Sequence, residues 1–151
     1  MSDGAIDEQQ LAERVVRRML ATDALSQWLG LEVVDVAPRR STCRMTVRPD
    51  MVNGFGVSHG GIVFSLADSA FAFACNTHGR VTVSVDNSIT FPAAVHPGDV
   101  LEAVAVEEAA SNRLAYYRVD VHNQRGEIVA LFRGTAYRTA KPHFPDDAPH
   151  A

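Results

Sequence analysis

The sequence has no apolar run that approaches the 18 residues of a membrane span, and its acidic N-terminus has no apolar core of a signal peptide. It has two cysteines, Cys43 and Cys75, which are too few for a disulfide framework. It also has no run of basic residues, and its net charge is −4, which argues against nucleic acid as a partner. These absences predict a cytoplasmic protein with reduced thiols that binds neither membrane nor nucleic acid.

Motifs for metals and nucleotides are missing as well. The six histidines show neither H-x-x-x-H nor H-E-x-x-H spacing, so the sequence predicts no metal site. No G-x-G-x-x-G follows a strand, and G-x-x-x-x-G-K-[ST] does not occur, so nucleotide phosphates are not bound in the usual ways. We therefore expect no cofactor.

What is present fits one globular domain. The chain has 151 residues, of which 46% are hydrophobic and 21% charged, as is ordinary for a folded domain with a real core. Residues 7–21 predict an amphipathic helix on the outside of the domain. Asp23 predicts the cap of a second, short helix that ends at Gly30, with Trp28 as an anchor against the core.

The rest of the chain is organised around residues 53–79. A glycine-rich turn, residues 54–61, leads into a helix that ends near Asn76. From residue 62 to residue 75 only Ser65, Asp68 and Ser69 are polar, so we expect a helix buried on all sides. An ionised Asp68 would be costly there unless it is paired or its pKa shifts. It indicates either a catalytic carboxylate or an acid that only hydrogen-bonds a neighbouring strand.

Strand patterns lie on both sides of this helix. They cover residues 31–37 and 41–47 before it, and 80–91, 100–108, 114–122 and 127–138 after it. A buried helix between strand runs predicts an α+β fold in which a curved antiparallel sheet wraps around the helix. The expected division is N-terminal helices at 1–30, the main domain at 31–139 and a flexible tail at 140–151. A free sheet edge predicts pairing with a second copy.

In residues 80–91 polar side chains alternate with the apolar set Val81, Val83, Val85, Ile89 and Phe91. Ser84, Asp86 and Ser88 are predicted to share one face with two threonines. That face is either exposed to solvent or directed into a cleft.

Gly56 to Gly60 matches G-x-S-x-G, the nucleophile elbow of serine hydrolases, with Ser58 as the nucleophile. The context argues against it, because that fold places a parallel sheet of strand–helix units before the elbow. His59 is the next residue in the chain and Asp68 lies almost three turns along the helix, so neither easily completes a triad.

The remaining candidates suit acyl transfer without a serine nucleophile. The backbone N–H groups of His59, Gly60 and Gly61 lie at a helix N-terminus, where they are unpaired and can stabilise an oxyanion. Glycine lets a substrate carbonyl come close to the backbone. Asp68 could then activate water or attack the carbonyl directly.

The stretch from Asn53 to Asn76, N-G-F-G-x-x-H-G-G-x-x-F-x-L-A-D-x-A-F-A-x-A-C-N, resembles the hot-dog fold acyl-CoA thioesterases. Within them it is most similar to the PaaI-type hydroxyphenylacetyl-CoA thioesterases of phenylacetate degradation. The resemblance implies a hot-dog fold, with Asp68 as the catalytic carboxylate and Gly60 as the donor that polarises the thioester carbonyl. It also implies that Asn53 and His59 support that turn and that Ser84 helps to hold the attacking water.

Gly61, Asp86 and Ser88 are expected to contact the substrate, an acyl-CoA or aryl-CoA. Gly60 and Asp68 are too far apart on one helix to act on one carbonyl, which predicts a homodimer with shared active sites, and dimers of dimers are expected. A hot-dog dehydratase acting on hydroxyacyl thioesters and a non-catalytic acyl-CoA binding domain remain as alternatives. The segment Lys141 to Pro145 resembles the histidine motif of hot-dog dehydratases only faintly.

Overall fold

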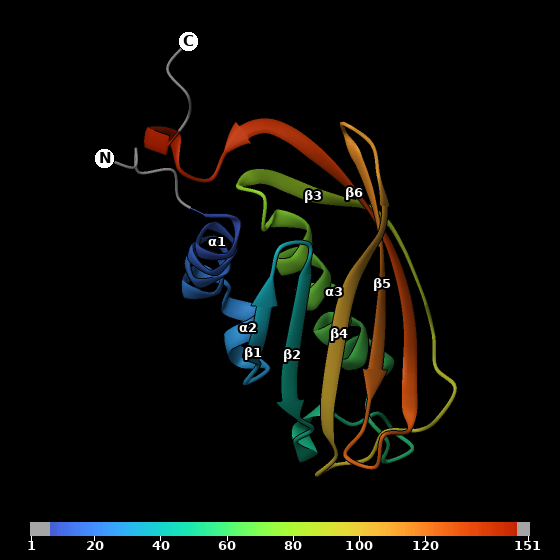
Figure 1. Ribbon diagram of the computed structural model, residues 1–151. Helices are drawn as coiled ribbons and strands as arrows, with labels where there is room; N and C mark the ends of the chain where they lie inside the picture. The colour runs from blue at the N-terminus through green and yellow to red at the C-terminus, as the bar shows by residue number, and fades with distance from the viewer. Residues whose placement is uncertain (1–6, 148–151) are drawn as a thin grey trace.

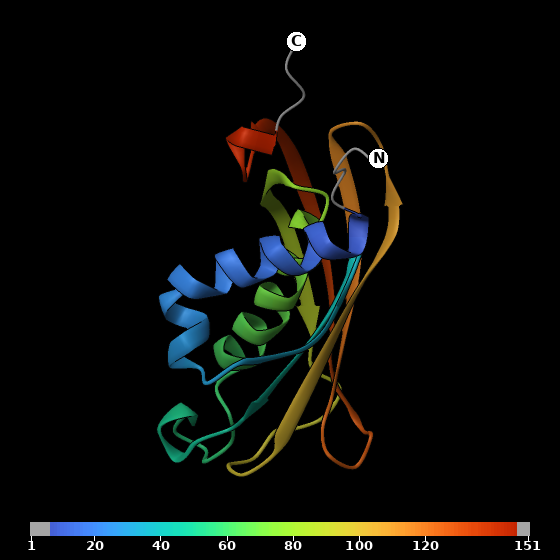
Figure 2. The same cartoon turned by 60° about the vertical axis from the view of Figure 1, so that its left-hand side comes forward.

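The computed structural model describes residues 7–147. One long helix, α3, lies against a curved sheet, and two shorter helices cover the helix from the other side (Figure 1, Figure 2). The helices are α1 (Glu8–Thr22), α2 (Ala24–Trp28) and α3 (Gly60–Asn76). The strands are β1 (Glu32–Ala37), β2 (Arg40–Thr46), β3 (Arg80–Thr90), β4 (Val100–Ala110), β5 (Leu114–His122) and β6 (Ile128–Pro142). Short 3₁₀ turns follow at Pro49–Met51 and Pro145–Asp147.

The sheet has six strands in the order β1-β2-β4-β5-β6-β3, and every pairing is antiparallel. β3 follows α3 in the chain and pairs with β6 at one end of the sheet. The sheet curves, and α3 lies on its concave side (Figure 2). This confirms the predicted α+β hot-dog arrangement. The edge strands are β1 and β3.

The core lies between α3 and the concave face of the sheet. Phe71 of α3 is fully buried, and its ring centroid lies 5.5 Å from that of Tyr117 and 5.6 Å from that of Phe132. Edge-on aromatic packing of this kind adds to the free energy of burial. Leu66 and Phe73 are also fully buried.

The prediction that α3 is buried on all sides is wrong along one stripe. Gly61 is exposed, and Phe64, Ser65, Asp68 and Ala72 are only partly buried. Each of these positions is three or four residues from another of them, so they lie on one face of the helix. We call this face of α3 the open stripe.

The N-terminal helices begin as the sequence predicts. Asp7 accepts hydrogen bonds from the N–H groups of Gln9 and Gln10, and Asp23 accepts one from Ser26 N–H, as N-cap residues do. The prediction for Trp28 is wrong: its side chain is 50% exposed under the Arg48 guanidinium. Leu29, one residue later and about 100° further round, is the buried side chain instead.

A β-bulge interrupts the alternation in β3. Ser84 pairs with Ala136, a core residue of β6, whereas Asp86 pairs with Thr135 and Val85 has no partner. One extra residue reverses the faces of all later side chains. The prediction that Asp86 and Ser88 share a face with Ser84 is therefore wrong.

The last strand extends beyond the predicted domain boundary at residue 139. β6 continues to Pro142, and His143 N–H then donates to Gly79 O at 2.7 Å. The Arg14 guanidinium lies 3.8 Å from the centre of the Phe144 ring. The start of the expected tail thus packs on α1, while residues 1–6 and 148–151 lie outside the described residues.

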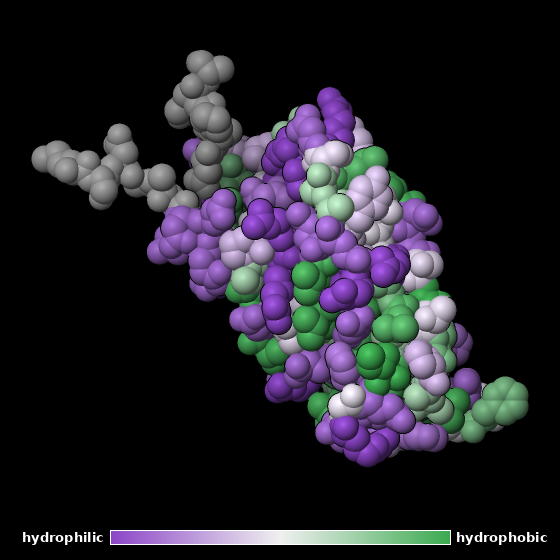
Figure 3. Space-filling model, turned by 45° about the vertical axis from the view of Figure 1, so that its right-hand side comes forward, coloured by the Kyte–Doolittle hydropathy of each residue, from purple (hydrophilic) through white to green (hydrophobic). Residues whose placement is uncertain are grey.

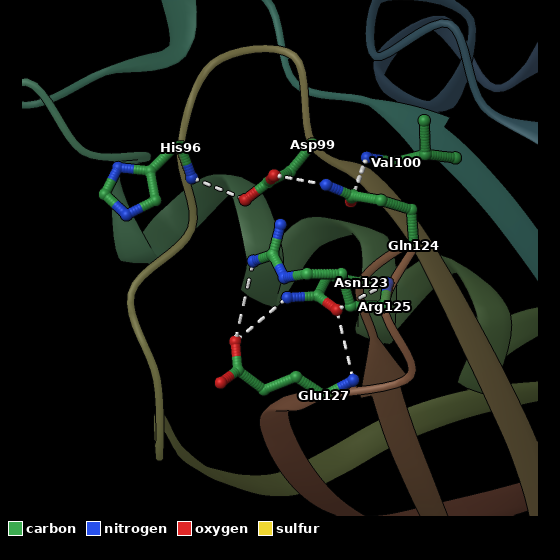
Figure 4. A network of polar contacts seen from close by, with 7 residues as sticks. All are labelled: His96, Asp99, Val100, Asn123, Gln124, Arg125 and Glu127. Atoms are coloured by element: carbon green, nitrogen blue, oxygen red, sulfur yellow. Dashed lines mark hydrogen bonds and ion pairs between the residues drawn. The ribbon is translucent and has the colours of Figure 1, made fainter.

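A polar network joins two loops at one end of the sheet (Figure 4). Asp99 accepts from His96 N–H and from Gln124 Nε2, each at 2.8 Å, and Val100 N–H donates to Gln124 Oε1. Asn123 Oδ1 accepts from the N–H groups of Arg125 and Glu127 within the predicted β5–β6 hairpin. The network fixes the loop between β3 and β4, which also borders the start of α3.

Candidate active site

The start of α3 is shaped by two side chains that bond to nearby backbone. His59 is the N-cap residue, and its Nδ1 accepts from Gly61 N–H at 2.9 Å. Asn53 Oδ1 accepts from Phe55 N–H at 2.9 Å, and Asn53 N–H donates to Val57 O. Both side chains therefore bond to the backbone of the turn that leads into the helix.

Gly60 is the first residue of α3, so its N–H has no acceptor within the helix. It lines a cavity of about 310 Å³ together with Val57, Ser58 and the loop after β3. A Cβ at position 60 would lie 3.2 Å from the Phe91 ring. Glycine therefore keeps the backbone accessible next to that ring, at the positive end of the helix dipole.

Asp68 lies in the middle of α3, on the open stripe, and is partly buried. Burial and then the nearby carboxylate of Asp23 raise its pKa above the ordinary value of 3.8. The hydrogen bond recorded for its carboxylate comes from Asn87 Nδ2 of β3, at 3.4 Å. The site thus contains a carboxylate that is a stronger base than an exposed one.

Ser84 and Asn87 face α3 from the edge strand. Ser84 Oγ donates to Asn87 Oδ1 at 2.9 Å, so the two side chains and Asp68 form a chain of hydrogen bonds. Sequence reasoning missed Asn87, because strict alternation assigned it to the apolar face. The signal in the sequence is an amide at a position whose alternate neighbours, Val85 and Ile89, are apolar. It can be interpreted only once the bulge is known.

Asp86 and Ser88 lie on the outer face of the sheet. They line a cavity of about 190 Å³ together with Glu108 and Arg133, which form an ion pair at 2.6 Å. The fold does not bring them to Asp68 within one chain. Asn53, His59, Gly60 and Gly61, by contrast, are grouped at one end of α3.

The serine-hydrolase alternative has no support in the geometry. The Ser58 hydroxyl donates to His59 O at 3.4 Å, and the Ser58 side chain is buried. His59 Nδ1 is occupied by Gly61 N–H, and His59 rather than Ser58 caps the helix. Cys43 and Cys75 are free and buried, and burial raises the pKa of each thiol to about 12. None of these groups is an activated nucleophile.

Other features lie away from this site. A cavity of about 330 Å³ is found at the far end of α3, where Arg39, His78 and Arg138 are among its lining residues. His143 Nε2 lies 2.7 Å from Asn76 Oδ1, also at that end. Within residues 7–147, no cluster of three or more His, Cys, Asp or Glu residues is placed to hold a metal ion. No helix in the same range has the length and apolar character needed to cross a membrane.

Gly60 and Asp68 are eight positions apart in one continuous helix. At 1.5 Å per residue their backbones are about 12 Å apart. An oxyanion donor must lie about 3 Å from the oxygen that it stabilises. Within one chain, the Gly60 N–H and the Asp68 carboxylate are therefore too far apart to act on the same carbonyl group.

Comparisons with known proteins identify the family. The family model described as thioesterase superfamily matches residues 55–130. Acyl-coenzyme A thioesterase PaaI of Escherichia coli is 37% identical over 120 residues, which are 80% of this chain and 86% of that protein. Human acyl-coenzyme A thioesterase 13 is 30% identical over 132 residues, covering 85% and 94%.

Among solved structures, the E. coli PaaI protein from the phenylacetic acid degradation operon superposes with a TM-score of 0.88 at 33% identity. The superposition covers 90% of this chain and 99% of that one. The central helix, Gly60–Asn76, falls within the residues matched by the family model. The chain belongs to the thioesterase superfamily and has the hot-dog fold.

Proposed function

We propose that this protein hydrolyses an acyl-CoA or aryl-CoA thioester to the free acid and CoA. The observation that carries the proposal is Asp68, a partly buried carboxylate with a raised pKa on the open stripe of α3. The names of the relatives, acyl-coenzyme A thioesterase PaaI and acyl-coenzyme A thioesterase 13, support this substrate class.

In the proposed reaction Asp68 either activates a water molecule or attacks the thioester carbonyl carbon itself, and in the second case water then hydrolyses the acyl–Asp68 anhydride. The Gly60 N–H stabilises the oxyanion that develops, and the thiolate of CoA leaves. His59 and Asn53 keep the turn in shape through the bonds to Gly61 and Phe55. Ser84 contributes from the edge strand, on the same side as Asp68.

Each site is proposed to form between two chains. In a dimer with antiparallel central helices, the start of one α3 passes the middle of the other, so Gly60 of one chain can serve Asp68 of its partner. The exposed edge strand β3 supports such pairing. The open stripe supports it as well, because it leaves one side of a largely apolar helix uncovered.

Larger assemblies are also proposed, with dimers joined into tetramers. On the outer face of the sheet, Tyr116 and Leu131 are 44% and 42% exposed. Figure 3 shows apolar side chains among polar ones on the side of the molecule that is turned toward the viewer.

The experiment is a measurement of free-thiol release from a panel of CoA thioesters with aliphatic and aromatic acyl groups. Thiol release supports the proposal, and preferred release from hydroxyphenylacetyl-CoA would extend to this chain the pathway named for PaaI. Enoyl product without thiol would indicate a dehydratase. Tight CoA-ester binding without turnover would indicate a binding domain.

Subunit complementation tests the shared site. An Asp68→Asn chain is mixed with a chain whose glycine turn is disabled by Gly60→Pro, and subunit exchange is verified with differently tagged chains. The shared-site arrangement gives one intact site in each mixed dimer, so activity returns. Verified exchange without activity would contradict it.

A further inference from the structure

Asn87, which has no role in the proposed reaction, donates a hydrogen bond to Asp68. Asn87 Nδ2 lies 3.4 Å from Asp68 Oδ1, and Asn87 Oδ1 accepts from Ser84 Oγ at 2.9 Å. A hydroxyl that donates to the amide oxygen leaves the amide nitrogen directed at the carboxylate. Ser84 has no recorded hydrogen bond to Asp68 itself, so within this chain its link to the carboxylate passes through Asn87.

The backbone makes room for this amide in two ways. The bulge at Val85 turns Asn87 toward α3, since Asn87 now pairs with Gly134 on the inner face. A Cβ at Gly134 would lie 3.0 Å from Asn87 Oδ1 and 2.8 Å from the Phe71 ring. Glycine on β6 therefore lets both side chains occupy the space beside the helix.

The chemical type of the donor also fits a base. Asn87 is neutral, so it can orient one carboxylate oxygen without the large fall in pKa that an arginine or lysine would cause. The charged group that acts on Asp68 is Asp23, the N-cap of α2, and Asp68 in turn raises the pKa of the Cys75 thiol further along α3. Neither supplies a positive charge, and the second oxygen of Asp68 has no recorded donor in the described chain.

We propose that Asn87 is a positioning residue for Asp68: its amide holds Oδ1 so that Oδ2 faces the reacting carbonyl, and Ser84 acts by fixing that amide. The proposal rests on the proposed function and deepens it. Ser84 is then a support for Asn87 and not a direct ligand of the attacking water.

The test compares Asn87→Leu, which keeps the approximate size but removes the donor, with Asn87→Asp. Loss of one hydrogen bond to a charged group lowers kcat by roughly tenfold or more, while KM stays within about twofold, because in this proposal Asn87 acts on the Asp68 carboxylate and not on the substrate. Asn87→Leu removes a donor to the ionised form, so the acid limb of kcat/KM moves to higher pH. Asn87→Asp places a like charge beside Asp68 and moves that limb further in the same direction. Thr90→Ala, an exposed change on the outer face of the same strand, is the control and leaves kcat unchanged.

A double-mutant cycle separates the two roles of Ser84. If Ser84 acts through Asn87, Ser84→Ala lowers kcat in the wild-type background and adds nothing in the Asn87→Leu background. Equal losses in both backgrounds would show that Ser84 acts directly and would overturn the relay. Three results for Asn87→Leu would overturn the positioning role. They are a kcat within twofold of wild type, a rise in KM alone, and a loss of activity that follows a lower melting temperature with no shift in the pH profile.

One measurement does not depend on turnover. NMR titration of the ¹³C-labelled Asp68 carboxyl group should show a higher pKa in Asn87→Leu than in wild type. An unchanged pKa would overturn the contact. If the wild type cleaves no thioester in the panel, the proposed function fails, while this titration still decides whether Asn87 holds Asp68.

Discussion

Replacing Asp68 by Asn should change activity and stability in opposite directions. The substitution keeps the size of the side chain and a carbonyl oxygen that can accept from Asn87 Nδ2, so the contact at 3.4 Å can persist. It removes the base and the nucleophile. Loss of such a group lowers kcat by about 10²- to 10⁴-fold.

The stability effect follows from the raised pKa of Asp68, which is caused first by burial and then by Asp23. Because the folded-state pKa lies above the unfolded value of 3.8, ionised Asp68 lowers the free energy of unfolding. This loss is absent below the unfolded pKa and develops as pH rises through the folded pKa. Asn at this position avoids it, so at pH 7 the variant should be more stable than wild type.

The assay pairs thiol release with urea unfolding at several pH values. The difference in stability between Asp68→Asn and wild type should be largest at neutral pH and should shrink toward zero near pH 4. Asp35→Asn, at an exposed position of β1, is the charge-matched control and should change neither quantity appreciably. Activity within tenfold of wild type, or a variant that is less stable at pH 7, would refute the reasoning.

Three further predictions concern residues outside the hydrogen-bonded group formed by Ser84, Asn87 and Asp68. Ser58→Ala should retain most activity, because its hydroxyl only donates to a neighbouring carbonyl, and a fluorophosphonate adduct on Ser58 would contradict this. Burial and then the charge of Arg138 lower the pKa of His78 to about 4. As the pH drops from 6.5 to 4, this group should therefore lower the free energy of unfolding of the wild type by up to about 1.4 kcal/mol per pH unit. His78→Asn should show a smaller decrease over the same pH range in urea titrations. Gly134→Ala should lower the free energy of unfolding by about 1–3 kcal/mol through overpacking, whereas Gly54→Ala, where nothing lies within 4 Å of the added Cβ, should have little effect in the same denaturation assay.

The elements whose signals are local could be predicted from the sequence. The helix α3 was predicted because an apolar run follows a glycine turn, and its end at Asn76 agrees with the structure. The Asp23 cap was predicted because its side chain acts within three residues, whereas Asp7, predicted as the first residue of the helix, is its N-cap. The β5–β6 hairpin was predicted for the same reason, from Asn123 to Gly126.

The errors concern properties that depend on a neighbouring element. Trp28 and Leu29 differ by one position, and only the direction in which α2 meets α3 decides which of them is buried. The sequence marks the bulge in β3 only weakly: Val85 continues the alternation and yet lacks a partner on β6, and the one irregularity is Asn87 on the face predicted to be apolar. A single unpaired residue moves Asp86 and Ser88 away from the site and brings in Asn87.

The open stripe of α3 connects these points to the proposed dimer. The sequence predicts a helix buried on every side, and in one chain the sheet and the N-terminal helices cover all of it except the face that carries Phe64, Asp68 and Ala72. An apolar helix gains free energy if that last face is covered too. The edge strand β3, which carries Ser84 and Asn87, borders the same face. If a second copy covers this face, the surface that completes the core also completes the active site. A substitution at Phe64 that blocks dimer formation should then abolish thiol release even with Asp68 and Gly60 intact. Sedimentation of a Phe64→Arg variant beside its activity measures this, and an active monomer would contradict it.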